Sequence, residues 1–273
     1  LSFFSGSNLA PTIERTRTAL KSMEEIGSKR MISVFLRPLL QTMLNLHDLS
    51  IEGPAELAMH EHVIAFMDGQ GGKIGQSSHK NFLLMNHYLC AMILSAIFNE
   101  NELAVKMFGS YVEAAEQRPN RGMVIVAETF YKGLVAASAC RLPSQIHKKG
   151  QWREIADDAL QTMKLYCNHT LAWNFQSKVE LLCAEIALID GDVAEATRAY
   201  QAAIQFASNH RFCQEEALAC ERAGMFFMAT SSTELGILYL KKAHACWVKF
   251  GAHRKAEQLA VTFQLLLYAD VPA

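Results

Sequence analysis

Residues 67 to 78 read MDGQGGKIGQSS, in which four glycines surround a lysine and two serines follow. Glycine-rich backbone beside a lysine is typical of loops that bind nucleotide phosphates. The phosphate-binding motif G-x-x-x-x-G-K-[ST] is incomplete here, because Ile74 follows Lys73 and Met67 stands where the first glycine should be. A dinucleotide fingerprint fails as well, because Ile74 occupies its third glycine position. We therefore interpret the segment as a flexible connection between helices.

Metal and acid–base chemistry is suggested next by His60, Glu61 and His62 in the sequence MHEHVIAF. Residues two apart do not share a helix face, whereas the zinc-protease motif needs two histidines four apart. The other histidines singled out are scattered: His87, His169, His210 and His244. Since no Ser, His and acid arrangement can be assembled from the spacing, the sequence predicts no catalytic residue, no metal ligand and no cofactor.

Seven cysteines are present, with no C-x-x-C pair. An odd number without paired spacing is not typical of a disulfide framework or a zinc site, so we expect a reducing compartment, the cytoplasm. Cys213 and Cys220 are seven residues apart and share one helix face, which favours packing in the core.

The composition is 51% hydrophobic with a formal net charge of -1. Such a chain can bury a large core, and it lacks the basic excess that nucleic-acid binding uses. Asn86 and His87 interrupt the longest apolar run, FLLMNHYLCAMILSAIF, which is too short to span a bilayer. We expect neither nucleic-acid binding nor membrane insertion.

The sequence predicts helices, because only six prolines occur and β-branched residues do not alternate with polar ones. Helices must therefore position any functional site. Small and apolar residues recur at offsets of 0, 4, 7 and 11, which stack on one helix face. Three of these sets start at positions 156, 196 and 236, and the fourth starts at 104. The sets are Ala104, Phe108, Tyr111 and Ala115; Ala156, Leu160, Met163 and Cys167; Ala196, Tyr200, Ala203 and Ala207; and Gly236, Leu240, Ala243 and Trp247.

A preceding helix is predicted to pair with each of these helices. Gly191 is suited to end one helix in the left-handed conformation, and Asp192 with Glu195 forms a capping-box sequence that begins the next. Ser231 and Glu234 have the same spacing before the last set.

Small residues also recur where the paired helices must approach. Ala184 lies twelve residues before Ala196, and Gly224 lies twelve before Gly236. The predicted unit is a helical hairpin, and stacked hairpins form an α-solenoid. Aromatic residues at helical spacing are expected in its core rather than in a ligand groove: Tyr111, Trp173, Tyr200, Phe226, Phe227, Tyr239 and Trp247.

Alanine or glycine in both helices, with an aromatic residue four positions later, resembles the tetratricopeptide (TPR) pattern with a lengthened repeat. Residues 80 to 268 resemble the TPR-like helical region of large signalling proteins, most specifically in GDVAEATRAYQAAIQFASNHRFCQEEALACERAGMFFM and GILYLKKAHACWVKFGAHRKAEQL. In that family a protein-kinase-like domain and a STAND-type ATPase precede this region, and GAF and sensor histidine kinase domains follow it. The resemblance implies a module of a longer chain and transfers no catalytic residue.

The resulting expectation is an all-α, TPR-like α-solenoid with an N-terminal helical part (1–68), a Gly-rich linker (69–79) and helical repeats (80–268). We expect a non-catalytic scaffold that contacts a protein partner or neighbouring domains of a signal-transduction ATPase or histidine kinase. One alternative is a solenoid that senses a ligand or peptide and switches a kinase output domain. Another is an all-α enzyme with a dispersed site. Successive repeats carry no matching Lys, Arg and Asn set of the kind that holds peptide carboxylates in TPR proteins.

Overall fold

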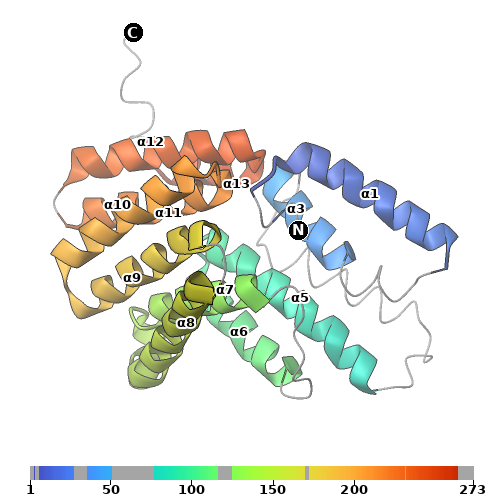
Figure 1. The fold of residues 1–273 in the computed structure, drawn as a ribbon, viewed down its shortest axis with the longest axis horizontal. Helices are drawn as coiled ribbons and strands as arrows, with labels where there is room; N and C mark the ends of the chain where they lie inside the picture. The colour runs from blue at the N-terminus through green and yellow to red at the C-terminus, as the bar shows by residue number, and fades with distance from the viewer. Residues whose placement is uncertain are drawn as a thin grey trace, which may run out of the picture.

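Every regular element in the described residues of the computed structural model is a helix (Figure 1). The structure describes residues 3, 6–27, 36–50, 77–115, 125–169, 172–230 and 232–263. The α-helices are α1 (Leu9–Glu25), α3 (Arg37–His47), α5 (Ser77–Ile97), α6 (Asn101–Ala115), α7 (Ile125–Ala139), α8 (Lys149–His169), α9 (Gln176–Asp190), α10 (Val193–Asn209), α11 (Cys213–Ala229), α12 (Thr233–Phe250) and α13 (His253–Thr262). Two short 3-10 segments, η3 (Pro143–Lys148) and η4 (Ala172–Asn174), flank α8.

Two of the predicted features fall outside the described residues. These are the glycine-rich segment up to residue 76, with Lys73, and the group of His60, Glu61 and His62. Helix α5 begins at Ser77, so the last three positions assigned to the linker belong to a helix.

Consecutive helices pack in pairs, α5 with α6, α7 with α8, α9 with α10 and α11 with α12 (Figure 1). The turn between α9 and α10 forms as predicted. Gly191 has a φ of 73°, and the Asp192 side chain accepts the Glu195 N–H at 2.9 Å. Such caps are local sequence signals that end one helix and begin the next.

Two details of the predicted caps are wrong. The Glu195 carboxylate binds Arg198, and the Asp192 N–H donates to the Ala187 carbonyl, so the reciprocal half of the capping box does not form. Helix α12 has Ser232 at its N-cap, without a side-chain hydrogen bond, rather than the predicted Ser231. In the first case a backbone bond of the preceding turn already satisfies the Asp192 N–H, which the Glu195 carboxylate would otherwise reach.

The small residues lie where paired helices approach closely. A Cβ added to Gly236 would lie 2.9 Å from the Gly224 carbonyl oxygen, so the α11 and α12 backbones are nearly in contact. All twelve residues that the sequence analysis assigned to repeat packing are buried: Ala104, Phe108, Tyr111, Ala184, Ala196, Tyr200, Ala203, Gly224, Gly236, Leu240, Ala243 and Trp247.

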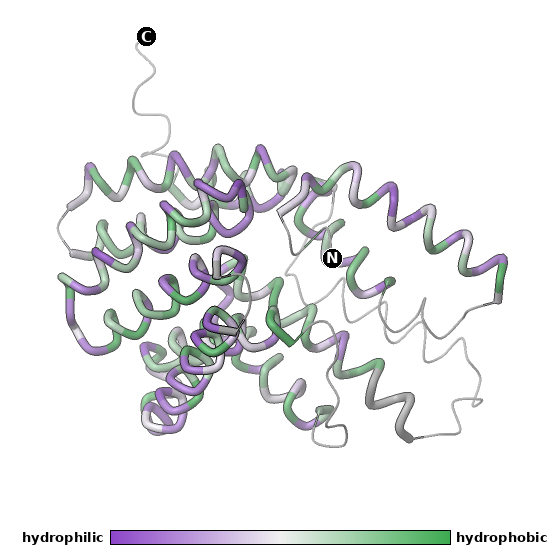
Figure 2. The backbone as a smooth tube through the Cα atoms, in the orientation of Figure 1, coloured by the Kyte–Doolittle hydropathy of each residue, from purple (hydrophilic) through white to green (hydrophobic). Residues whose placement is uncertain are grey.

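Helix α7 forms the centre of the molecule. It contacts α5, α6, α8 and α9, and hydrophobic residues dominate its length (Figure 2). No described helix combines the length and the apolar character that a membrane crossing requires.

The N-terminal helices pack against the last described helices. Helix α3 contacts both α5 and α13, and the Phe3 and Phe250 rings lie 6.3 Å apart. The Asn8 side-chain amide donates to the Lys249 carbonyl at 2.9 Å, and His47 Nδ1 lies 2.7 Å from the Gly251 carbonyl oxygen. The first and last helices therefore share one hydrophobic core.

Candidate functional site

A polar groove of about 410 Å³ lies between α8, α9 and α10. We call it the α8–α10 groove. It is lined by Lys164, Cys167 and Asn168 from α8, by Gln176, Val179, Glu180 and Cys183 from α9, and by Glu195 and Arg198 from α10.

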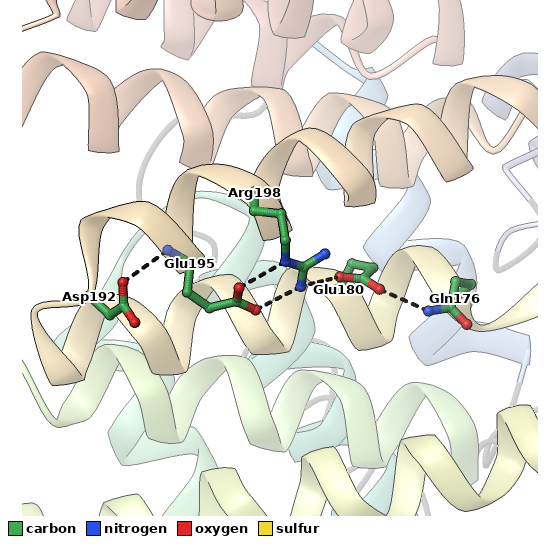
Figure 3. Close-up of polar contacts among 5 residues, drawn as sticks. All are labelled: Gln176, Glu180, Asp192, Glu195 and Arg198. Atoms are coloured by element: carbon green, nitrogen blue, oxygen red, sulfur yellow. Dashed lines mark hydrogen bonds and ion pairs between the residues drawn. The ribbon is translucent and has the colours of Figure 1, made fainter.

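Arg198 organises the polar side of the groove (Figure 3). Its Nε and Nη2 donate to the two carboxylate oxygens of Glu195 at 2.8 and 2.7 Å, and Nη2 also donates to Glu180 at 3.1 Å. Gln176 donates to the other Glu180 oxygen at 2.9 Å. Because Glu195 and Arg198 are three residues apart on α10, they share a face, and the turn at Asp192 points that face toward α9.

The charges in this groove balance. Hydrogen bonding to Arg198 lowers the pKa of Glu195, and hydrogen bonding to Glu195 and then Glu180 raises the pKa of Arg198. Lys164 is exposed and adds a second positive charge opposite the two carboxylates. The groove is therefore suited to polar, hydrogen-bonding groups of either sign rather than to a highly charged ligand.

The two thiols of the groove are not activated nucleophiles. Burial raises the pKa of Cys183, and burial also raises the pKa of Cys167. A raised thiol pKa keeps the sulfur protonated near neutral pH, and the thiolate is the reactive form. Neither thiol of the groove is therefore favoured as a nucleophile.

Other ionisable groups are paired inside the core. The Glu185 carboxylate accepts hydrogen bonds from Arg141 at 2.7 Å and Tyr200 at 2.9 Å, and Arg222 lies 3.2 Å away. Burial opposes ionisation of Glu185, but Arg222 and Arg141 outweigh it and lower the pKa to about 2. This cluster joins α9, α10 and α11 to the segment that follows α7. Its three partners and its low pKa disfavour a role for the Glu185 carboxylate as a base.

A second buried cluster centres on Glu221 of α11. Lys255 from α13 donates to it at 2.6 Å, Trp247 from α12 at 2.9 Å and Asn99 from the α5–α6 turn at 2.5 Å. Burial lowers the pKa of Lys255, and Glu221 acts in the opposite direction. These contacts tie the last three helices to α5 and α6, and we assign them a structural role.

The structure separates the predicted packing residues from this groove, because all twelve lie in the core and none lines it. The sequence analysis did not identify the groove residues. The one available signal was the three-residue spacing of Glu195 and Arg198, which is common on ordinary solvated helices.

The predicted aromatic core holds with one exception. Trp173 is 44% exposed and stacks on Phe212 at 5.9 Å, with His210 beside it at 5.5 Å. It lies in η4, outside the helical pairs, which is why helical spacing predicted its burial wrongly.

The histidines of the sequence analysis do not come together where their side chains are described. His87 is buried in α5, His210 lies beside Trp173, and His244 lies on α12. The described residues contain no group of three or more His, Cys, Asp and Glu side chains that could hold a metal ion. No family model matches this chain, and no curated protein or solved structure matches it either.

Proposed function

We propose that this chain is a non-catalytic, TPR-like helical-repeat scaffold whose α8–α10 groove binds an extended segment of a protein partner or neighbouring domain. Four helical pairs and the recurrence of small residues at fixed offsets support the solenoid interpretation. The sequence resemblance supports its placement as a cytoplasmic module of a signalling ATPase or histidine kinase.

The groove is the observation that carries the proposal. Its polar groups come from three consecutive helices, and Lys164, Asn168 and Arg198 are exposed. A peptide in extended conformation presents both carbonyl acceptors and N–H donors, which match the mixed amide, cation and carboxylate lining. In the two buried clusters, by contrast, the charged side chains form ion pairs within each cluster.

A peptide array tests this function directly. The full chain is incubated with immobilised short random peptides, and binding is compared between the wild type and Arg198→Ala. We expect a reproducible subset of peptides to bind the wild type and to lose at least about tenfold in affinity with Arg198→Ala, because its hydrogen bonds position two groove carboxylates.

Arg17→Ala is the matched control, because Arg17 is also an exposed arginine paired with a carboxylate three residues away, Glu14, but it lies on α1. It should leave peptide binding unchanged. Equal loss of binding in both variants, or no peptide bound by the wild type, contradicts the proposal. Sustained ATP hydrolysis by the purified chain contradicts its non-catalytic part.

A second candidate, a ligand-sensing solenoid, is favoured by the groove volume. About 410 Å³ falls in the range of roughly 300–1,000 Å³ that small-molecule sites occupy. A thermal-shift screen with small polar metabolites separates the two candidates, because a ligand of the folded state raises the melting temperature. A compound that stabilises the wild type but not Arg198→Ala supports sensing, and a screen without such a compound contradicts it.

A further inference from the structure

Two cysteines outside the groove meet at one end of the α11–α12 pair. Cys213 is the first residue of α11, and Cys246 lies in the last turns of α12. The Cys213 thiol donates a hydrogen bond to the Cys246 carbonyl oxygen at 3.3 Å, and the two side chains also influence each other's pKa. The same two helices approach closely further along, at Gly224 and Gly236.

The surroundings of the two sulfurs differ. The hydrogen bond with Cys246 lowers the pKa of Cys213, and Lys249 acts in the same direction, while burial and Glu216 oppose it. The N-terminus of α11 adds a partial positive charge beside Cys213. The same hydrogen bond and burial raise the pKa of Cys246. Cys213 is therefore the sulfur of the pair that ionises more readily, and Cys246 keeps its proton.

Charged side chains near this pair come from both helices. Glu216 lies on the α11 side and is itself bound by Lys242 at 2.9 Å, and Lys249 is exposed on α12. Cys220, further along the same face of α11, offers an internal contrast, because burial raises its pKa to about 12 and its side chain is fully buried. Cys213 and Cys246 retain 7% and 9% exposure, enough for a molecule as small as hydrogen peroxide to approach on local fluctuation.

We propose that Cys213 and Cys246 form a peroxide-reactive dithiol site that closes to an intramolecular disulfide. The Cys213 thiolate attacks one peroxide oxygen, so that an S–O bond forms, the O–O bond breaks and the departing hydroxide takes up a proton as water. The Cys246 sulfur then attacks the sulfenic acid of Cys213. An S–S bond forms, the S–O bond breaks, and the hydroxyl group leaves as water with the proton from Cys246. Both sulfurs are oxidised, and one peroxide is reduced to two waters.

The position of the site gives the disulfide a structural consequence. A Cβ on Gly6 would lie 3.2 Å from the Cys213 backbone nitrogen, so the N-terminal segment lies directly against this end of α11. The bond would close a chain loop between residues 33 positions apart and restrict the unfolded chain. Oxidation should therefore raise the melting temperature of the chain.

Thiol counting tests the proposal. The full chain is treated with hydrogen peroxide, quenched, unfolded and labelled with a maleimide mass tag. Of its seven cysteines, two should escape labelling, and peptide mapping should join the peptides containing Cys213 and Cys246. Dithiothreitol should restore all seven labels. In Cys246→Ser, dimedone should trap a sulfenic acid on Cys213, and in Cys213→Ser no disulfide should form.

Cys220→Ser is the matched control and should form the disulfide at the wild-type rate. Circular dichroism establishes that each serine variant is folded. Seven labels after peroxide treatment of folded protein would overturn the proposal, and so would a disulfide mapped to another pair or one between two chains. Thiol counting does not depend on peptide binding, so a failure of the dithiol proposal and a failure of the scaffold function can be distinguished.

Discussion

Glu185 of α9 carries a buried negative charge that side chains from α10 and α11 also contact. Its carboxylate contacts Arg141, Tyr200 and Arg222, and both Glu185 and Arg222 are almost fully buried. Removing one partner of a buried ion pair leaves the other charge uncompensated, which is more destabilising than the pair was stabilising.

Glu185→Gln should lower the free energy of unfolding by about 3 kcal/mol near neutral pH, because two arginines lose their counter-charge. The folded-state pKa of Glu185 is about 2, below its ordinary value of 4.5. A depressed pKa contributes stability above the ordinary value, and that contribution is lost as the pH falls toward the folded value. The difference between wild type and variant should therefore shrink between about pH 4.5 and about pH 2.

Urea denaturation across this pH range measures the effect. Glu14→Gln is the control, because Glu14 forms an ion pair with Arg17 in which both side chains are more than half exposed. It should change stability little at any pH. If Glu185→Gln lowers the free energy of unfolding by the same amount at every pH, the effect comes from packing and not from the charge of Glu185.

At the scale of the element, the α11–α12 pair depends on two glycines. A Cβ on Gly236 would lie 2.9 Å from the Gly224 carbonyl oxygen and 3.0 Å from the Met228 backbone nitrogen. Backbone atoms cannot rotate aside as a side chain can, so the helices must separate to admit even one methyl group.

Gly236→Ala should therefore lower the free energy of unfolding by about 1–3 kcal/mol through overpacking. Gly109→Ala is the matched control, because Gly109 also lies within a helix, α6, but has open space where its Cβ would be. That change should stabilise the chain by about 0.5–1 kcal/mol, since alanine favours a helix over glycine. Chemical denaturation measures the free energy of unfolding of both variants. A change of the same sign in both would contradict the close approach of α11 and α12 at Gly236.

The helices and several of their ends follow from the sequence because the signals are local. The offsets from Ala196 to Ala207 mark one buried face of α10, and Gly191 ends α9 in a conformation that glycine favours. The cap at Ser231 was predicted one residue too early. Two adjacent serines offer the same capping chemistry, and the preceding turn decides which of them stands at the helix boundary.

On the scale of the whole molecule, the two ends of the described chain are joined. In a linear repeat array each unit contacts only its neighbours. Here α3 contacts α13, and the Arg254 side chain donates to the Asn45 carbonyl at 3.2 Å. Such contacts couple the N-terminal helices to α13, the last described helix.

Leu46→Ala tests that coupling, because Leu46 on α3 is fully buried. The cavity should lower the free energy of unfolding by about 2–5 kcal/mol. Hydrogen exchange should accelerate in α13 and α5, which contact α3, more than in the distant α8. Leu49→Ala, at a position 63% exposed just after α3, is the control and should leave both stability and exchange nearly unchanged. Exchange confined to α3 would show that the two ends fold independently.

The sequence by itself determined the helical class, the buried face of each repeated set and the turn at Gly191, because periodicity and capping act within a few residues. Tertiary structure alone decided which faces meet. The α8–α10 groove, the Glu185 and Glu221 clusters and the contact between Cys213 and Cys246 each combine side chains from different helices. A periodic pattern specifies that a face is buried but carries no information on its partner, so the arrangement of these groups depends on packing of the whole chain.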